Sequence, residues 1–179
     1  MAVDLRRAFA LLARPESEWN RIVADTASSG AVRPTAGVLL AVATIASALG
    51  YLVSAPVGTP FGFVPLNAAM FAASRLLAVW LAWQLLRRDK DVSSQSATLL
   101  VGWGSVPIHA AGILEVLPVP FLRWLWALAG LGLSYVNLAT AATPVLGTSS
   151  DRGSAVAMRA TVALAIPIVA FDLLRHLCP

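Results

Sequence analysis

The chain alternates between long apolar stretches and short polar connections. After a polar opening, five stretches each approach the roughly 20 residues that a helix needs to span a bilayer. These stretches lie at about 35–55, 64–86, 96–117, 121–143 and 155–176. The pattern therefore predicts an all-α polytopic membrane bundle of five transmembrane helices, with a transmembrane domain over 35–179 and an N-terminal segment over 1–34.

The N-terminal segment 1–34 is polar and charged, but apolar residues recur in it at helical spacing. One predicted helix carries Leu5, Ala8, Phe9 and Leu12 on its apolar face. A second begins near Pro15, a residue suited to a first helical turn, and carries Trp19, Ile22 and Val23. We expect two short amphipathic helices in the headgroup plane, with docking onto the bundle as the alternative.

Composition supports a membrane protein. Hydrophobic residues make up 58% of the chain and charged residues 12%, against roughly 25% charged residues in ordinary soluble domains. The net charge of +4 does not indicate nucleic acid binding, because the basic residues cluster between apolar runs, where loops meet anionic headgroups. We expect the lipid bilayer to be a partner and nucleic acid not to be one.

The basic residues also predict an orientation. Ten of them fall in the N-terminal segment or in the connections after the second and fourth apolar stretches: Arg6, Arg7, Arg14, Arg21, Arg33, Arg87, Arg88, Lys90, Arg152 and Arg159. Only Arg123 and Arg175 flank the other side. Because cytoplasmic loops are enriched in Lys and Arg, we expect a multi-pass protein of the cytoplasmic (inner) membrane, with its N-terminus inside and its C-terminus outside.

Four ionisable residues form a candidate intramembrane polar site. Arg75 lies in the middle of the second stretch, and His109 lies at a similar depth in the third. Glu115 and Asp172 lie within about two turns of the outer ends of the third and fifth stretches, where we expect their carboxylates to reach water. A central Arg costs about 2.5–3.5 kcal/mol on insertion scales, so it needs a partner.

Two prolines are predicted helix kinks. Pro107 cannot donate to the carbonyl of Trp103, and Pro167 likewise frees the carbonyl of Ala163. We expect Arg75 either to bond a freed carbonyl or to pair with Glu115 or Asp172. Its role is then a buried tie between helices, a functional polar pocket, or snorkelling to a headgroup.

No residue pattern indicates catalysis. Ser105 and His109 are four positions apart, but Pro107 distorts the turn between them and no third group is placed to orient the histidine. The chain contains no HExxH motif and no phosphate-binding glycine loop. Cys178 has no second thiol with which to bind a metal. We expect no enzyme, no cofactor and no metal site.

Short motifs over nearly the whole chain resemble the bacterial branch of the Yip1 domain family. One is the run Gly102-Trp-Gly-Ser-Val-Pro107, followed by Ile113-Leu114 and Leu117-Pro118. Another is Arg14-Pro-Glu-Ser-Glu-Trp19-Asn-Arg-Ile22, which is similar to the family's Pro-x-x-x-Trp-x-x-Ile pattern. The chain departs from the family at Trp103, where Tyr is more usual, and at Pro144, where Gly is frequent.

The resemblance implies a five-helix integral membrane protein that organises membranes or serves as an accessory subunit, without catalytic residues. The GTPase-binding role of the eukaryotic relatives is not carried over. Our leading hypothesis is a non-enzymatic protein that organises the membrane or binds a partner, which is another membrane protein, a second copy of itself or lipid. The alternative is a small transporter or channel subunit built around Arg75, His109 and Glu115.

Overall fold

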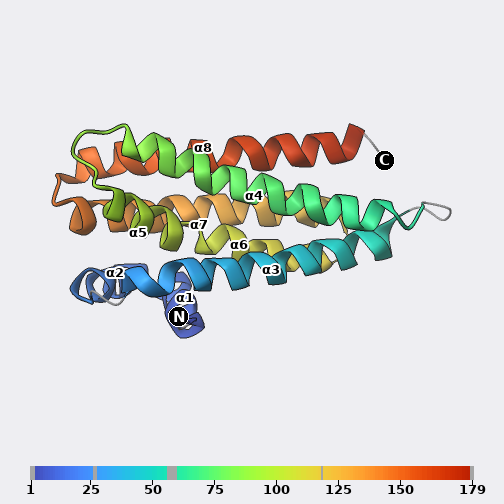
Figure 1. Ribbon diagram of the computed structural model, residues 1–179, viewed down its shortest axis with the longest axis horizontal. Helices are drawn as coiled ribbons and strands as arrows, with labels where there is room; N and C mark the ends of the chain where they lie inside the picture. Colours follow the sequence, from blue (N-terminus) through green and yellow to red (C-terminus); the bar gives the residue numbers. More distant parts are fainter. Residues whose placement is uncertain (1–2, 26–27, 56–59, 118, 178–179) are drawn as a thin grey trace.

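The computed structural model describes residues 3–25, 28–55, 60–117 and 119–177, which form helices and no strands (Figure 1). The elements in chain order are α1 (Leu5–Ala13), α2 (Pro15–Ala24), α3 (Ser28–Ser54), α4 (Phe63–Arg87), α5 (Ser94–Gly104), α6 (Val106–Ile113), the 3₁₀ helix η1 (Leu114–Val116), α7 (Pro120–Leu146) and α8 (Ser150–Leu177). The predicted all-α bundle is confirmed.

In the described part of the chain, five helical segments are long and apolar enough to cross a membrane, as expected of a multi-pass membrane protein. They are Gly30–Ser54, Phe63–Arg87, Ser94–Val116, Leu122–Leu146 and Ser150–Arg175. The third segment, made of α5, α6 and η1, is the most enclosed of the five and packs against α3 and α7. The long helices run alongside one another, with the N-terminal helices at one end of the bundle and the C-terminus toward the other (Figure 1).

The third span is interrupted where the sequence predicts a kink. α5 ends at Gly104 and α6 begins at Val106, so Pro107 lies in the first turn of a new helix, where its missing N–H has no intrahelical partner to lose. At Gly104 an added Cβ would collide with the Leu138 side chain, so this glycine allows α5 and α7 to approach closely. By contrast, α8 continues through Pro167 as one helix.

Two helix boundaries differ from the hydropathy pattern. α3 begins at Ser28 and contains Pro34, so the expected boundary between 34 and 35 falls inside a helix. α7 extends to Leu146 and ends because Gly147 adopts a left-handed conformation, with φ of 63°. Hydropathy marks the apolar part of a helix, whereas hydrogen bonding and caps determine where the helix ends.

The two N-terminal helices dock onto the bundle, as the alternative interpretation expects. The Trp19 side chain is fully buried, and its Nε1 donates to Asn137 Oδ1 of α7 at 2.6 Å. α1 is held to α2 by Arg7, whose guanidinium pairs with Glu18 at 3.1 Å. Phe9 and Val23, which we expected on the apolar faces, are exposed.

Candidate functional site

Arg75 and Glu115 form an ion pair inside the bundle. Arg75 Nη2 donates to Glu115 Oε1 at 3.3 Å, and the two side chains are 1% and 4% exposed. The Arg75 guanidinium also lies 4.8 Å from the centre of the Phe71 ring. Of the partners considered for Arg75, the structure therefore selects Glu115.

Glu115 does not reach water, and that expectation is wrong. Besides Arg75, its carboxylate accepts from Ser47 Oγ at 3.0 Å and from Arg175 Nη1 at 3.4 Å. An added Cβ at Gly50 would collide with the carbonyl oxygen of Glu115, so the glycine lets α3 lie directly against η1. This close approach encloses the carboxylate, although it is near the end of its span.

Asp172 is buried as well, with 8% of its surface exposed. It lies on α8, close enough to Arg75 for the two charges to attract each other. Three of the four expected polar-site residues, Arg75, Glu115 and Asp172, are therefore gathered in one half of the bundle. This burial contradicts the expectation that the Asp172 carboxylate reaches water.

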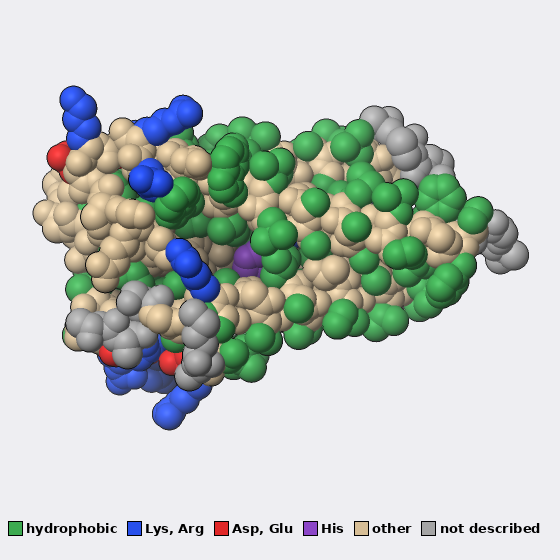
Figure 2. Space-filling view, in the orientation of Figure 1, with side chains coloured by type: hydrophobic (Ala, Val, Ile, Leu, Met, Phe, Trp, Pro, Cys, Tyr) green, Lys and Arg blue, Asp and Glu red, His purple; other side chains and the backbone are tan. Residues whose placement is uncertain are grey.

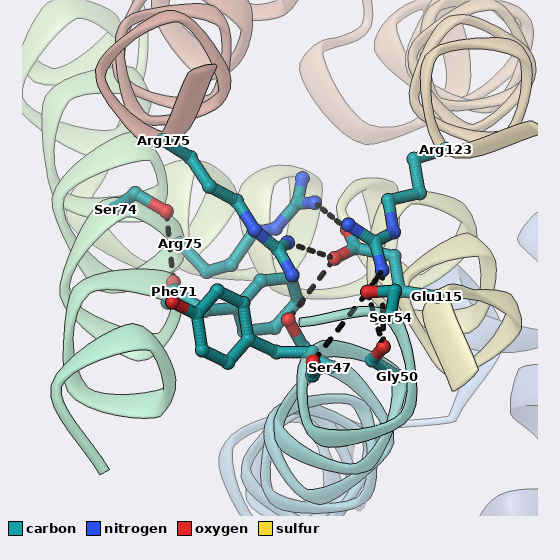
Figure 3. A network of polar contacts seen from close by, with 10 residues as sticks. Ser47, Gly50, Ser54, Phe71, Ser74, Arg75, Glu115, Arg123 and Arg175 are labelled. Atoms are coloured by element: carbon teal, nitrogen blue, oxygen red, sulfur yellow. Dashed lines mark hydrogen bonds and ion pairs between the residues drawn. The ribbon is translucent and has the colours of Figure 1, made fainter. Parts of the chain in front are cut away.

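Two further arginines complete the group. Arg123 Nη2 donates to the carbonyl of Gly50 at 3.1 Å and to Ser54 Oγ at 2.7 Å. The guanidinium of Arg175 lies 5.3 Å from the centre of the Tyr51 ring. Figure 3 shows that the three guanidinium groups converge around Glu115. We call Arg75, Arg123, Arg175, Glu115 and Asp172 the arginine cluster.

Sequence reasoning treated Arg123 and Arg175 only as markers of orientation. A signal was present, because these two were the exceptions to a strongly one-sided distribution of basic residues. In the structure both residues are held by contacts within the bundle. Arg175 binds the Glu115 carboxylate, and Arg123 binds the carbonyl oxygen of Gly50 on α3.

The carbonyl that Pro107 frees is bound by an asparagine. Asn137 Nδ2 donates to the carbonyl oxygen of Trp103 at 3.1 Å, while Asn137 Oδ1 accepts from Trp19. One buried side chain thereby joins α2, α5 and α7 at the break in the third span. Arg75 donates to Glu115 and not to this carbonyl, so that alternative for its partner is not supported.

His109 lies on the wall of a groove and is near enough to Arg75 for the guanidinium charge to act on it. Its side chain is 2% exposed, and its Nδ1 has no hydrogen-bond partner among the described residues. The groove has a volume of about 430 Å³ and is lined by α3, α4, α5 and His109 of α6, but by neither Arg75 nor Glu115. Figure 2 shows a histidine at the base of a depression bordered by hydrophobic side chains.

One end of this groove is polar. Arg33 lines it, and Trp83 Nε1 donates to Thr98 Oγ1 at 3.2 Å. The guanidinium of Arg87 lies 4.5 Å from the centre of the Trp83 ring. Neither Arg33 nor Arg87 forms an ion pair with another described residue.

A second charged group joins the α4–α5 connection to α8. Arg152 pairs with Asp89 at 3.1 Å and also with Asp91, and Arg159 pairs with Asp89 at 3.3 Å. Burial by itself would raise the pKa of Asp89, but the backbone N–H of Asp91 and the two guanidinium groups outweigh it and hold that pKa below its ordinary value. The group therefore fixes a connection at the bundle end opposite the arginine cluster.

Comparisons with known proteins identify no relative. No family model matches the chain, and neither a curated protein nor a solved structure matches it. In the described residues, no group of three or more His, Cys, Asp or Glu side chains could hold a metal ion. The likeness to the Yip1 family therefore rests on the short motifs alone.

Proposed function

We propose that this chain is a non-enzymatic, Yip1-like protein of the cytoplasmic membrane that organises the bilayer by holding a lipid in the groove between α3 and α4. The observation that supports this proposal is the lateral position of the groove. Its walls come from Ala36, Gly37 and Leu40 of α3 and from Leu76 and Val79 of α4. Such walls offer hydrocarbon contacts to a chain that enters from the side.

The size of the groove favours one hydrocarbon chain over a partner helix. A volume of about 430 Å³ lies within the roughly 300–1,000 Å³ typical of small-molecule sites. A helix with its side chains is about 10–12 Å across, so a groove of this volume takes up about one turn of a partner helix at most. A hydrocarbon chain also has no polar groups, so it needs no hydrogen bonds from the apolar walls.

Charge at the polar end favours an anionic headgroup. Arg33 and Arg87 both lie there without an acidic partner among the described residues. Each basic residue near a membrane surface attracts anionic lipid by about 1 kcal/mol. With the predicted orientation, this end faces the cytoplasmic leaflet, where such lipids would be available.

The alternative, a small transporter or channel subunit around Arg75, His109 and Glu115, has less support. Transport requires a path that reaches those residues, and the groove includes His109 without the other two. Arg75 and Glu115 are instead paired with each other. Flux into vesicles that depends on His109 would favour the transporter over the lipid-holding protein.

The proposal is tested by filling the groove. At Gly37 an added Cβ meets nothing within 4 Å, so Gly37→Trp places a ring in the groove without a backbone clash. Gly132 is equally open but lies on α7 outside the groove, and Gly132→Trp is therefore the matched control. We expect Gly37→Trp to reduce the amount of anionic phospholipid that copurifies with the protein, as measured by native mass spectrometry. Gly132→Trp should leave that amount unchanged.

A photocrosslinker at Ala36 provides a second measurement, in native membranes. Capture of phospholipid would support the proposal. Capture of a membrane protein instead, or equal lipid retention by both tryptophan variants, would contradict it.

A further inference from the structure

The arginine cluster contains more positive than negative charge. Arginine stays protonated in proteins, so among the described side chains three guanidinium groups face the two carboxylates of Glu115 and Asp172. The remaining acidic residues belong to the N-terminal segment, the α4–α5 connection and the first turn of α8: Asp4, Glu16, Glu18, Asp25, Asp89, Asp91 and Asp151. Those segments lie at the opposite end of the bundle from the cluster.

The guanidinium groups also have unused donors. Nε and Nη1 of Arg75, Nε of Arg123 and Nη2 of Arg175 are buried without a hydrogen-bond partner in the described part of the chain. An unpaired donor on a buried charged group is unfavourable, and a group of them in one place calls for a bound acceptor. All three side chains contribute, so the unused donors belong to the cluster and not to one misplaced residue.

The three arginines are held in place before any ligand arrives. Phe71 lies under the Arg75 guanidinium, Tyr51 lies under that of Arg175, and Arg123 is tied to the carbonyl of Gly50. Phe71 is itself braced edge-to-face by Phe171, with ring centres 6.0 Å apart. Positioned donors bind with a smaller loss of side-chain freedom than mobile ones.

We propose that the arginine cluster binds a phosphate-type oxyanion. Guanidinium groups match the oxygen spacing of such anions and donate several charge-assisted hydrogen bonds to them. The anion would supply both the missing negative charge and acceptors for the unused donors. Arg123 is only half-buried and lies in the first turn of α7. An anion therefore reaches the cluster past Arg123, from this end of the bundle.

The oxyanion has two possible sources with the same chemistry: a free phosphate, or the phosphodiester of a lipid headgroup in the leaflet at this end. The site is independent of the lipid groove, because none of the five cluster residues lines that groove. Failure of one proposal therefore leaves the other intact.

The test measures the unfolding midpoint of the full chain in a phosphate-free maltoside detergent. Inorganic phosphate should raise the midpoint in a saturable manner, and chloride at equal ionic strength should not. In nanodiscs of a neutral galactolipid, a retained phosphate effect identifies free phosphate as the source. In nanodiscs of phosphatidylglycerol, stabilisation with no further effect of added phosphate identifies the headgroup.

Arg123→Gln removes one positive charge together with the N–H donors of its guanidinium group. We expect it to weaken phosphate binding about tenfold or more, the equivalent of one lost charge-assisted hydrogen bond. Arg6→Gln, at an exposed position of α1 outside both the cluster and the groove, is the matched control and should bind phosphate as the unaltered chain does. If Arg123→Gln does not fold, Asp172→Asn tests the same site. This substitution should have the opposite effect and tighten phosphate binding, because it removes a negative charge.

Four outcomes would overturn the proposal. They are the absence of stabilisation by both phosphate and phosphatidylglycerol, equal stabilisation by chloride, an unchanged response in Arg123→Gln, and unchanged or weaker binding in Asp172→Asn.

Discussion

Arg75 and Glu115 are separated by 40 positions in the sequence and meet 3.3 Å apart inside the bundle. Their ion pair joins α4 to η1, and the other oxygen of the same carboxylate takes donors from α3 and α8. Four segments of the chain thus converge on one acidic side chain. Because charges buried in this way are strongly unfavourable when unpaired, the carboxylate is central to the stability of this half of the bundle.

Glu115→Gln should be strongly destabilising. It leaves Arg75 and Arg175 without their shared acceptor charge, and breaking a buried pair in this way costs about 3–5 kcal/mol. The free energy of unfolding, measured by SDS titration in mixed micelles, checks this value. Glu16→Gln is the control, since Glu16 is exposed. A loss below about 1 kcal/mol for Glu115→Gln would contradict the role that we assign to this ion pair.

Gly50→Ala should destabilise the chain, because the added Cβ would collide with the carbonyl oxygen of Glu115 and push α3 away from η1. Overpacking of this kind typically costs about 1–3 kcal/mol. Gly37→Ala is a control on the same helix, with nothing within 4 Å of the new Cβ. It should be neutral or stabilising by about 0.5–1 kcal/mol, since alanine favours a helix over glycine. Equal thermal unfolding midpoints of the two variants would contradict this account.

Trp19→Phe should loosen the N-terminal helices from the bundle. The substitution removes the donor to Asn137 Oδ1 and leaves a buried acceptor unsatisfied, at a cost of about 1–3 kcal/mol. Arg6 and Arg21 are exposed and are not followed by proline, so faster tryptic cleavage after these two residues reports the release. Trp80→Phe, at a side chain that is 51% exposed, should be cleaved at the same rate as the unaltered chain. If both variants are cleaved at that rate, Trp19 does not anchor these helices.

Acid should weaken the group formed by Asp89, Arg152 and Arg159. The pKa of Asp89 is held below its ordinary value in the folded chain. Its contribution to stability is therefore present above the unfolded-state pKa of about 3.9 and is lost as the pH falls through the lower folded-state pKa. Asp89→Asn should lower stability at neutral pH by at most about 1 kcal/mol and reduce the loss of stability on acidification. The unaltered chain and Asp89→Asn are titrated with acid in parallel, and unfolding is followed by circular dichroism. An equal loss of folded protein per pH unit below pH 4 in both would contradict this prediction.

The five candidate spans follow from the sequence because hydropathy is a local property. About 20 consecutive apolar residues mark a span wherever the rest of the chain lies. The break at Pro107 is local for the same reason, since a missing N–H and a ring clash act within one helical turn. The two amphipathic helices before α3 were also predictable, because their periodicity is visible in ten residues.

The partners of the polar side chains depend on tertiary structure. In a bilayer both faces of a helix are apolar, so periodicity does not tell which face turns inward, and the rotation of each helix is determined only by packing against its neighbours. That rotation brings Asn137 to Trp19, which is 118 positions away, and Arg123 to Gly50, which is 73 positions away. The sequence alone determined that Arg75 needs a partner within the membrane. The close approach of α3 to η1 at Gly50 decided that this partner is a buried Glu115, shared with Arg175.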